Sequence, residues 1–221
     1  MDLQAAVEQM PFYGNLNNEE KRLIGNSVNV RHYRKGDVLH SHLSECLGLI
    51  QLQSGSVRVT MQSSEGREIT IYTLQEGDRD VLSASCVINQ ITFDTMMIAD
   101  TDTDVLVIPA PVVGILDHSN IYVHSDLMEL SALRFSDAMW TMQQILFLRM
   151  DQRVAVFLLD EYSRTDNPEI AATQDRIARS ISSAREVTSR VLGRMEKDGL
   201  IETRRGTIRL LDIDALEALL G

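Results

Sequence analysis

The most informative stretch of the chain is TQDRIARSISSAREVTSRVLGRMEKDGLIETRRGTIRLLD, residues 173–212. Thr173 can cap a first helix over TQDRIARSI, and a polar turn at residues 182–183 leads into a second helix over AREVTSRVLGRMEKDG. Gly199 ends that helix, and LIET and TIRLLD flank a turn at residues 204–206. Two helices, a tight turn and a short hairpin predict a winged helix-turn-helix.

The second helix carries polar side chains on the face opposite its valines. Arginine can donate two hydrogen bonds to guanine O6 and N7, and glutamate can accept one from cytosine N4 in the major groove. The candidate base-contacting residues are Arg185, Glu186, Ser189 and Arg190. The alternative is a solvated (i, i+4) pair of Glu186 and Arg190, which would be worth only a few tenths of a kcal/mol.

Upstream of residue 110 the hydrophobic pattern has a period of two, which is typical of β-strands. Expected strands are VLH at 38–40, LGLIQL at 47–52, VRVTM at 57–61, ITIYTL at 69–74 and VLVIP at 105–109. Glycines in polar turn clusters separate them, as in a compact antiparallel barrel or roll. Before them, Asn17 and Glu20 form a capping-box pattern for a short helix over 17–27. The fold class is therefore α+β, with an N-terminal antiparallel β-roll of the double-stranded β-helix or jelly-roll type.

A helical pattern without Gly or Pro runs from about residue 124 to 161. A narrow seam with a seven-residue repeat suits a partner helix, and it comprises Met128, Phe135, Met142 and Arg149 with Ser131, Ala138, Ile145 and Gln152 interleaved. A second stripe is expected to pack on the roll: Leu133, Trp140, Phe147 and Val154. Residues 163–172 resemble a hinge. The predicted domains are a sensor roll at 1–123, a dimerisation helix at 124–162 and the winged helix-turn-helix at 163–221.

The net charge of −11 is unevenly distributed. Residues 1–163 hold 11 Lys and Arg against 22 Asp and Glu, whereas residues 176–209 hold 9 basic residues against 4 acidic ones. An acidic body with one basic segment is expected when a single module contacts phosphate.

The chain resembles the Crp/Fnr family of bacterial transcription regulators, through residues 173–212 and the roll motifs KGD at 35–37, SGSVRV at 54–59, EGREITIYTL at 65–74 and EGD at 76–78. The resemblance implies a cyclic-nucleotide-binding-like sensor domain and a homodimer joined along the long helix. It also implies an inverted-repeat site on double-stranded DNA, with TGA-containing half-sites, and RNA polymerase as a partner. A signal in the roll would change the helix seam and reorient the two recognition helices. Candidate phosphate contacts are Thr173, Ser183, Arg204 and Arg205.

The helix-turn-helix departs from the family pattern at its turn. Ser182 stands where glycine is common and must either tolerate a strained conformation or reshape the turn. Ala184 stands at the usual position of a capping serine, so Ser183 is expected to cap the second helix instead.

The sensor domain lacks the family's cyclic AMP motif. Val81 and Leu82 occupy the Gly-Glu place, Thr92 and Phe93 lie near the Arg-Ser place, and no basic residue occurs between Arg79 and Arg134. A buried cyclic phosphate would lack a cation, so we expect a neutral or apolar effector, or none, rather than cyclic AMP. The candidate pocket residues are Val81, Leu82, Ser83, Ser85, Cys86 and Thr92.

Other cofactor chemistries are constrained by the cysteine and histidine content. Two cysteines, Cys46 and Cys86, are too few for an all-cysteine iron–sulfur cluster. A haem- or redox-based sensor stays an alternative, with axial-ligand candidates Cys46, Cys86, His32, His40, His42, His118 and His124. Alternating His40 and His42 would face the same side of a strand and could bind a metal, but such a pair is more often a surface coincidence, so no resident metal site is expected.

Two other classes of function were weighed. An enzyme is not expected, because Cys86 has no oriented base or oxyanion hole and no catalytic set stands out. The other alternative is a sensor or interaction protein whose C-terminal module does not bind DNA. The start of the sequence is not a signal peptide and no apolar run reaches membrane-spanning length, so a cytoplasmic location is expected.

Overall fold

The computed structural model describes residues 3–41, 46–62, 68–81 and 95–220. The chain divides into two compact units, residues 1–139 and 140–221, which are described separately below. Every strand pairing between described residues is antiparallel.

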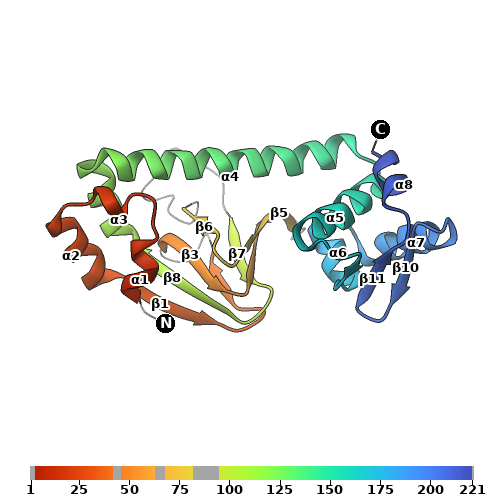
Figure 1. Ribbon diagram of the computed structural model, residues 1–221, viewed down its shortest axis with the longest axis horizontal. Helices are drawn as coiled ribbons and strands as arrows, with labels where there is room; N and C mark the ends of the chain where they lie inside the picture. The colour runs from red at the N-terminus through yellow and green to blue at the C-terminus, as the bar shows by residue number, and fades with distance from the viewer. Residues whose placement is uncertain (1–2, 42–45, 63–67, 82–94, 221) are drawn as a thin grey trace. The chain divides into compact units, whose positions relative to one another are not determined.

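The first unit is built on two four-stranded sheets (Figure 1). One sheet has the order β1-β8-β3-β6, with β1 Asn29–Tyr33, β8 Thr103–Pro109, β3 Gly48–Ser54 and β6 Arg79–Asp80. The other has the order β2-β7-β4-β5, with β2 Val38–His40, β7 Met96–Ala99, β4 Ser56–Gln62 and β5 Glu68–Gln75. The antiparallel β-roll expected from the period of two is confirmed.

Successive side chains of β3 and β8 point to opposite faces of the first sheet, so each face has its own buried core. Ile50 and Val107 join a buried cluster shared with β4, β5 and β7 of the second sheet. Their neighbours Leu49 and Leu106 belong to a different cluster, which contains the helices of this unit. Both faces of the sheet are therefore covered, which is why these strands are nearly continuous runs of apolar residues.

The helices of the first unit supply the second half of that core. They are α1 Leu3–Glu8, the short 3-10 helix η1 Tyr13–Asn15, α2 Asn18–Ser27, α3 Ala110–Ser119 and α4 Ile121–Phe147. The predicted capping box of α2 is confirmed, because Asn17 Oδ1 accepts from Glu20 N at 2.9 Å and Glu20 Oε2 accepts from Asn17 N at 2.8 Å. Buried side chains of α1, α3 and α4 meet those of β3 and β8 in one cluster.

The turn between β3 and β4 needs glycine at Gly55. Its φ is +82°, and a Cβ at this position would collide with the Thr103 side chain and the Asp102 carbonyl oxygen. Both the left-handed backbone and the close approach exclude other residues. The glycine predicted to mark this turn is confirmed as a structural requirement.

The predicted single helix over residues 124–161 is wrong in its continuity. Two helices, α4 and α5 Met150–Thr165, are separated at residues 148–149. Arg149 has an extended backbone with ψ of 164°, and the Gln152 side chain accepts a hydrogen bond from its N–H at 3.0 Å. A side-chain cap therefore interrupts the helix where no Gly or Pro announces a break.

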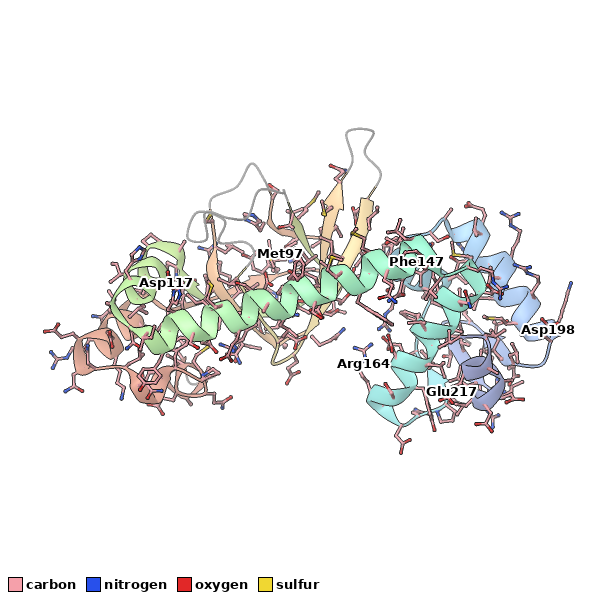
Figure 2. The ribbon with its side chains drawn as sticks, turned by 90° about the horizontal axis from the view of Figure 1, so that it is seen from above. Met97, Asp117, Phe147, Arg164, Asp198 and Glu217 are labelled. Carbon is pink, nitrogen blue, oxygen red and sulfur yellow. The ribbon has the colours of Figure 1, made fainter. Side chains whose placement is uncertain are left out.

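The second predicted stripe of α4 is also wrong. Leu133, Trp140 and Phe147 are exposed, and Phe147 marks the end of α4 in Figure 2. Val154, the fourth member, lies on α5 and is buried in the core of the second unit. The side chains that pack into the roll lie on a different face of the helix, namely Val123, Leu127, Leu130 and Arg134. The buried face contains an arginine, so a search for apolar residues alone selected the wrong stripe.

The second unit contains α5, β9 Glu169–Ile170, α6 Gln174–Ser180, α7 Arg185–Lys197, β10 Ile201–Arg204, β11 Thr207–Leu210 and α8 Ile213–Ala218. A single core joins α5 to α6, α7, α8 and the strands. The hinge expected at residues 163–172 is wrong, because β9 pairs with β11 and forms a three-stranded sheet in the order β10-β11-β9.

Candidate nucleic-acid interface

The helix-turn-helix is formed by α6 and α7. Thr173 caps α6 as predicted, with its hydroxyl oxygen accepting from Arg176 N at 3.2 Å. Ile177 of α6 and Val191 and Leu192 of α7 are buried in the core of the second unit. The apolar sides of both helices are therefore fixed inward, which leaves the polar sides in solvent.

The turn between the two helices agrees with one sequence prediction and contradicts another. Ser182 has a φ of +51°, so of the two outcomes expected for this position it adopts the strained, left-handed conformation. The expected Ser183 cap is wrong, because Ala184 is the N-cap residue of α7 and no side chain caps the helix. Ser183 instead donates its backbone N–H to the Ala178 carbonyl at 2.8 Å, which closes the turn.

The four candidate base-contacting residues lie in the first two turns of α7. Arg185, Glu186 and Arg190 are exposed, and Ser189 is half-buried. Among the described residues no cation pairs with the Glu186 carboxylate, and Arg190 Nε donates only to the Glu186 backbone oxygen at 3.4 Å. The solvated Glu186–Arg190 ion pair weighed above is therefore not formed. We call Arg185, Glu186, Ser189 and Arg190 the base-contact face.

Arg185 has a carboxylate neighbour that sequence reasoning missed. Its Nε lies 3.5 Å from Asp175 Oδ1, in the first turn of α6, and both side chains are largely exposed. An exposed ion pair of this kind contributes little to the free energy of folding. It positions the Arg185 guanidinium beside the start of α6.

The two arginines of the wing differ in their ion-pair partners. Arg204 donates from Nη2 to both carboxylate oxygens of Glu202 at 3.1 Å, whereas no described residue pairs with Arg205 at the exposed tip of the hairpin. Of the two arginines among the candidate phosphate contacts, Arg205 keeps its full positive charge available. Arg204 is partly neutralised by its own strand.

The wing is fastened to α7 by Glu196. Its Oε1 accepts from the Thr203 hydroxyl and the Thr203 backbone N–H, each at 2.7 Å. These two hydrogen bonds, the hydroxyl first and the backbone second, lower the pKa of Glu196. A Glu in the last turn of α7 and a Thr in the wing are the sequence signal that could have predicted this link.

Arg153 fixes the turn from the other side. This arginine of α5 is buried, and its guanidinium donates to the carbonyl oxygen of Ile181, the residue before the left-handed Ser182. The start of α5 therefore holds the turn that orients α7. An isolated arginine in an apolar helical run gave no sequence signal for this role.

In the first unit, a buried polar network joins β5 and β6 to α4. Arg134 Nε lies 3.3 Å from Asp80 Oδ1, and its Nη1 and Nη2 donate to Asp137 Oδ2 at 2.8 Å and to the Arg79 carbonyl at 2.6 Å. Tyr72 donates its hydroxyl to Asp80 at 3.1 Å. Burial, and then the Asp80 charge, raise the pKa of Tyr72 well above its ordinary value, so it stays a neutral donor.

Arg79 is also committed to a carboxylate. Its Nη1 and Nη2 donate to Asp126 of α4 at 2.5 and 2.9 Å. The two basic residues that flank the predicted effector region are therefore neutralised by acidic groups of the same unit. Sequence reasoning identified both arginines but not their partners.

Among the predicted effector-pocket residues only Val81 lies in the described part of the chain, where it is buried in the core that contains α1, α3 and α4. The others lie outside the described residues: Leu82, Ser83, Ser85, Cys86 and Thr92. His42 also lies outside them.

The remaining histidines have local partners. His32 Nδ1 lies 2.8 Å from Asp104, and His124 Nδ1 lies 2.8 Å from Asp117. His118 Nδ1 lies 2.7 Å from the Gly114 carbonyl, and His40 is buried. Within the described ranges no three His, Cys, Asp or Glu side chains gather as metal ligands. No helix in the same ranges has the length and apolar content to cross a bilayer.

Comparison with known proteins gives a consistent result for both units. Residues 30–114 match the cyclic nucleotide-binding domain, and residues 152–219 match the Crp-like helix-turn-helix domain. A Crp/Fnr-family transcriptional regulator from Eubacterium rectale has a solved structure with 38% identity and a TM-score of 0.86, covering 96% of this chain and 98% of that one.

More distant relatives share the architecture. FixK2 from Bradyrhizobium japonicum is 20% identical with a TM-score of 0.72, covering 87% of this chain and 96% of its own. The transcriptional regulator SdrP from Thermus thermophilus is 23% identical over 171 residues, which are 75% of this chain and 80% of that protein.

A β-roll, a long helix and a helix-turn-helix with a wing define the class of transcriptional regulators that couple a cyclic-nucleotide-binding-type domain to a DNA-binding module. The chain belongs to the Crp/Fnr family, and the resemblance inferred from its sequence is confirmed.

Proposed function

We propose that the protein is a homodimeric regulator that binds an inverted-repeat operator through one α7 per half-site. The observation that carries this proposal is the base-contact face, because its Glu186 carboxylate and Arg190 guanidinium form no ion pair with described residues and are free to meet base edges. The family resemblance suggests TGA-containing half-sites. Two-fold symmetry of a dimer requires a palindromic site.

Phosphate contacts come from the elements around α7. Arg205 at the wing tip offers an uncompensated charge, and the hydroxyl of Thr173 and the backbone near Ser183 lie at helix starts that favour anions. Arg204 contributes less, since Glu202 accepts its hydrogen bonds. The protein acts where bacterial DNA lies, in the cytoplasm, with RNA polymerase as its family-inferred partner.

The dimer forms along α4. An exposed apolar stripe recurs at helical spacing on this helix and comprises Met128, Phe135, Met139, Met142 and Leu146. Of the predicted seam, Met128, Phe135 and Met142 belong to this stripe. Ala138 packs against the core of the roll instead, Ile145 is half-buried, and Arg149 lies beyond the end of α4. Exposed apolar surface of this extent on one helix is typical of an interface.

The effector is not an anionic cyclic nucleotide held in the family's manner. Arg79 and Arg134, the cations that flank the predicted pocket residues in sequence, already pair with carboxylates. An added phosphate would have to displace them or remain uncompensated. We propose a neutral or apolar effector whose binding changes how β6 and α4 meet, and thereby the α4 seam and the two α7 helices.

Salt dependence tests DNA binding against a protein-contact role for the C-terminal module. Fluorescence anisotropy of labelled duplex DNA should give an affinity that falls steeply between about 50 and 200 mM salt, as phosphate contacts require. Arg205→Ala should reduce the slope of log K against log salt by about 1 for each copy in the dimer, and therefore by about 2 for the operator. The absence of any DNA binding at low salt, with the protein folded and dimeric, would contradict the proposal.

A further inference from the structure

A hollow of about 490 Å³ lies on the flank of α7, beside the base-contact face. Five side chains line it: Met150, Val187, Arg190, Val191 and Arg194. All of them belong to the second unit, with Met150 at the start of α5. The volume is within the range of roughly 300–1,000 Å³ that small-molecule sites occupy.

One face of α7 supplies most of this wall. Residues 187, 190, 191 and 194 are spaced i, i+3, i+4 and i+7, so they lie on one side of the helix. Val187 is only half-buried, although Val191 one turn later is fully part of the core. The apolar groups of Val187 and Met150 are therefore available to an occupant, with Val191 behind them in the core, and the flexible Met side chain can adapt to its shape.

The two remaining wall residues are cations. Arg190 and Arg194 are exposed and stand one helical turn apart, where like charges repel weakly. Across the described ranges, no carboxylate forms an ion pair with either guanidinium. An anion between them would gain charge-assisted hydrogen bonds and relieve the repulsion.

We propose that this hollow binds an amphipathic organic anion, a carboxylate on an apolar chain. A fully polar anion would make no favourable contact with the apolar side chains of the hollow. A pure hydrocarbon would leave the two arginine charges without a partner. Direct binding does not depend on the proposed function. A further consequence does rest on it: Arg190 belongs to both surfaces, so the ligand and an operator half-site compete.

Octanoate is a suitable probe, because it joins one carboxylate to an eight-carbon chain. Full-length protein carrying ¹³C at its methionine methyl groups is titrated, and Met150→Leu assigns the Met150 signal. Octanoate should shift that signal saturably, whereas acetate and 1-octanol at equal concentration should not. Equal shifts with 1-octanol, equal shifts at all methionines, or no shift at Met150 would each overturn the proposal.

Two variants separate the site from general surface charge. Arg194→Met keeps an apolar side chain but removes one guanidinium, and it should weaken octanoate binding about fivefold. Arg209→Met alters an exposed arginine of β11 outside the hollow and should leave the affinity unchanged. An unchanged affinity in Arg194→Met, with its thermal unfolding like that of the wild type, would contradict the charge role.

Competition is measured separately, on protein that binds its operator. Octanoate should raise the apparent Kd for DNA in the wild type and to a smaller degree in Arg194→Met. If the protein binds no DNA, the proposed function fails while the Met150 titration still decides the site. If operator binding is insensitive to saturating octanoate, the shared use of Arg190 is wrong.

Discussion

Arg134 of α4 lies against Asp80 of β6, with its guanidinium Nε 3.3 Å from the carboxylate Oδ1, and both side chains are buried. Tyr72 donates to the same carboxylate, and the Arg134 guanidinium stands over the Tyr72 ring at 5.1 Å. This cluster ties the last described strand before the predicted effector region to the helix that carries the proposed dimer stripe. Any displacement of β6 therefore acts on α4 through the Arg134–Asp80 pair and through the ion pair between Arg79 and Asp126.

Asp80→Asn should destabilise the first unit by about 2 kcal/mol, because breaking a buried pair leaves the remaining charge poorly compensated. The expected value is below the usual 3–5 kcal/mol because Arg134 keeps Asp137 and the Arg79 carbonyl. Thermal unfolding and hydrogen exchange of β5 measure the loss. Glu76→Gln, in the nearby exposed turn, is the matched control. Equal stability of Asp80→Asn and the control would refute the structural role of the pair.

Phe135→Lys should abolish the dimer at concentrations where the wild type is fully dimeric, with Kd raised at least about tenfold, because a large apolar contact is lost in each copy. Leu133→Lys is the control, since Leu133 is also exposed but lies on another face of α4. Sedimentation equilibrium distinguishes them. Dissociation by both variants, or by Leu133→Lys alone, would place the interface on another face.

Arg190→Ala should cost about 1–3 kcal/mol on the operator and relax the preference at one base pair. Arg205→Ala should weaken specific and random DNA alike, since a phosphate contact carries no sequence information. Anisotropy titrations on both kinds of duplex give the comparison. If Arg190→Ala lowers both affinities by the same factor, Arg190 contacts phosphate instead of a base.

Glu202→Ala should strengthen binding to random DNA severalfold at low salt, because it frees the Arg204 guanidinium from its strand partner. The gain should vanish in the double variant with Arg204→Ala. A gain that persists without Arg204 would mean that Glu202 acts by simple repulsion of phosphate.

Glu196 should carry its stabilising contact at neutral pH and lose it on acidification. Its folded-state pKa is lowered by the Thr203 hydrogen bonds, so the contribution is complete above the ordinary Glu pKa of about 4.3 and disappears as pH falls through the lower folded pKa. The Thr203 amide resonance should titrate with that lowered midpoint. Thr203→Val removes the hydroxyl donor and should raise the midpoint; an unshifted midpoint in this variant would contradict the assignment.

Sequence patterns correctly predicted the elements that depend on a single local pattern, such as a capping motif, a period of two or a tight turn. The capping box at Asn17, the strands from β2 to β5, and the helix-turn-helix with its left-handed Ser182 all follow from local chemistry. β1, β6, β7 and β9 were missed, since β1 is a polar, half-exposed strand and the other three have only two to four residues.

The features that sequence reasoning missed depend on contacts between distant residues. Arg134 can be buried because Asp80 of the roll, which also accepts a hydrogen bond from Tyr72, pairs with its guanidinium. The apolar pattern had predicted that a different face of α4 packs on the roll. Arg149 breaks the long helix through Gln152, which no helix-breaking residue signals. At the candidate site, the exposed position of the base-contact face could be predicted, but the contacts of Asp175 and Arg153 could not, because each acts across two elements. The link from Glu196 to Thr203 was missed although both residues stand in the sequence at places where they could meet.

The central claim, that α7 contacts bases in a symmetric operator, is tested most directly by selecting bound duplexes from a random DNA pool with ligand-free, reduced protein. The wild type should enrich a palindrome whose half-sites lie about one helical turn apart, Arg190→Ala should lose the preference at one base pair of each half-site, and Arg209→Met should reproduce the wild-type sequence. No enrichment by a folded dimer, an asymmetric sequence, or an unchanged preference in Arg190→Ala would contradict the account.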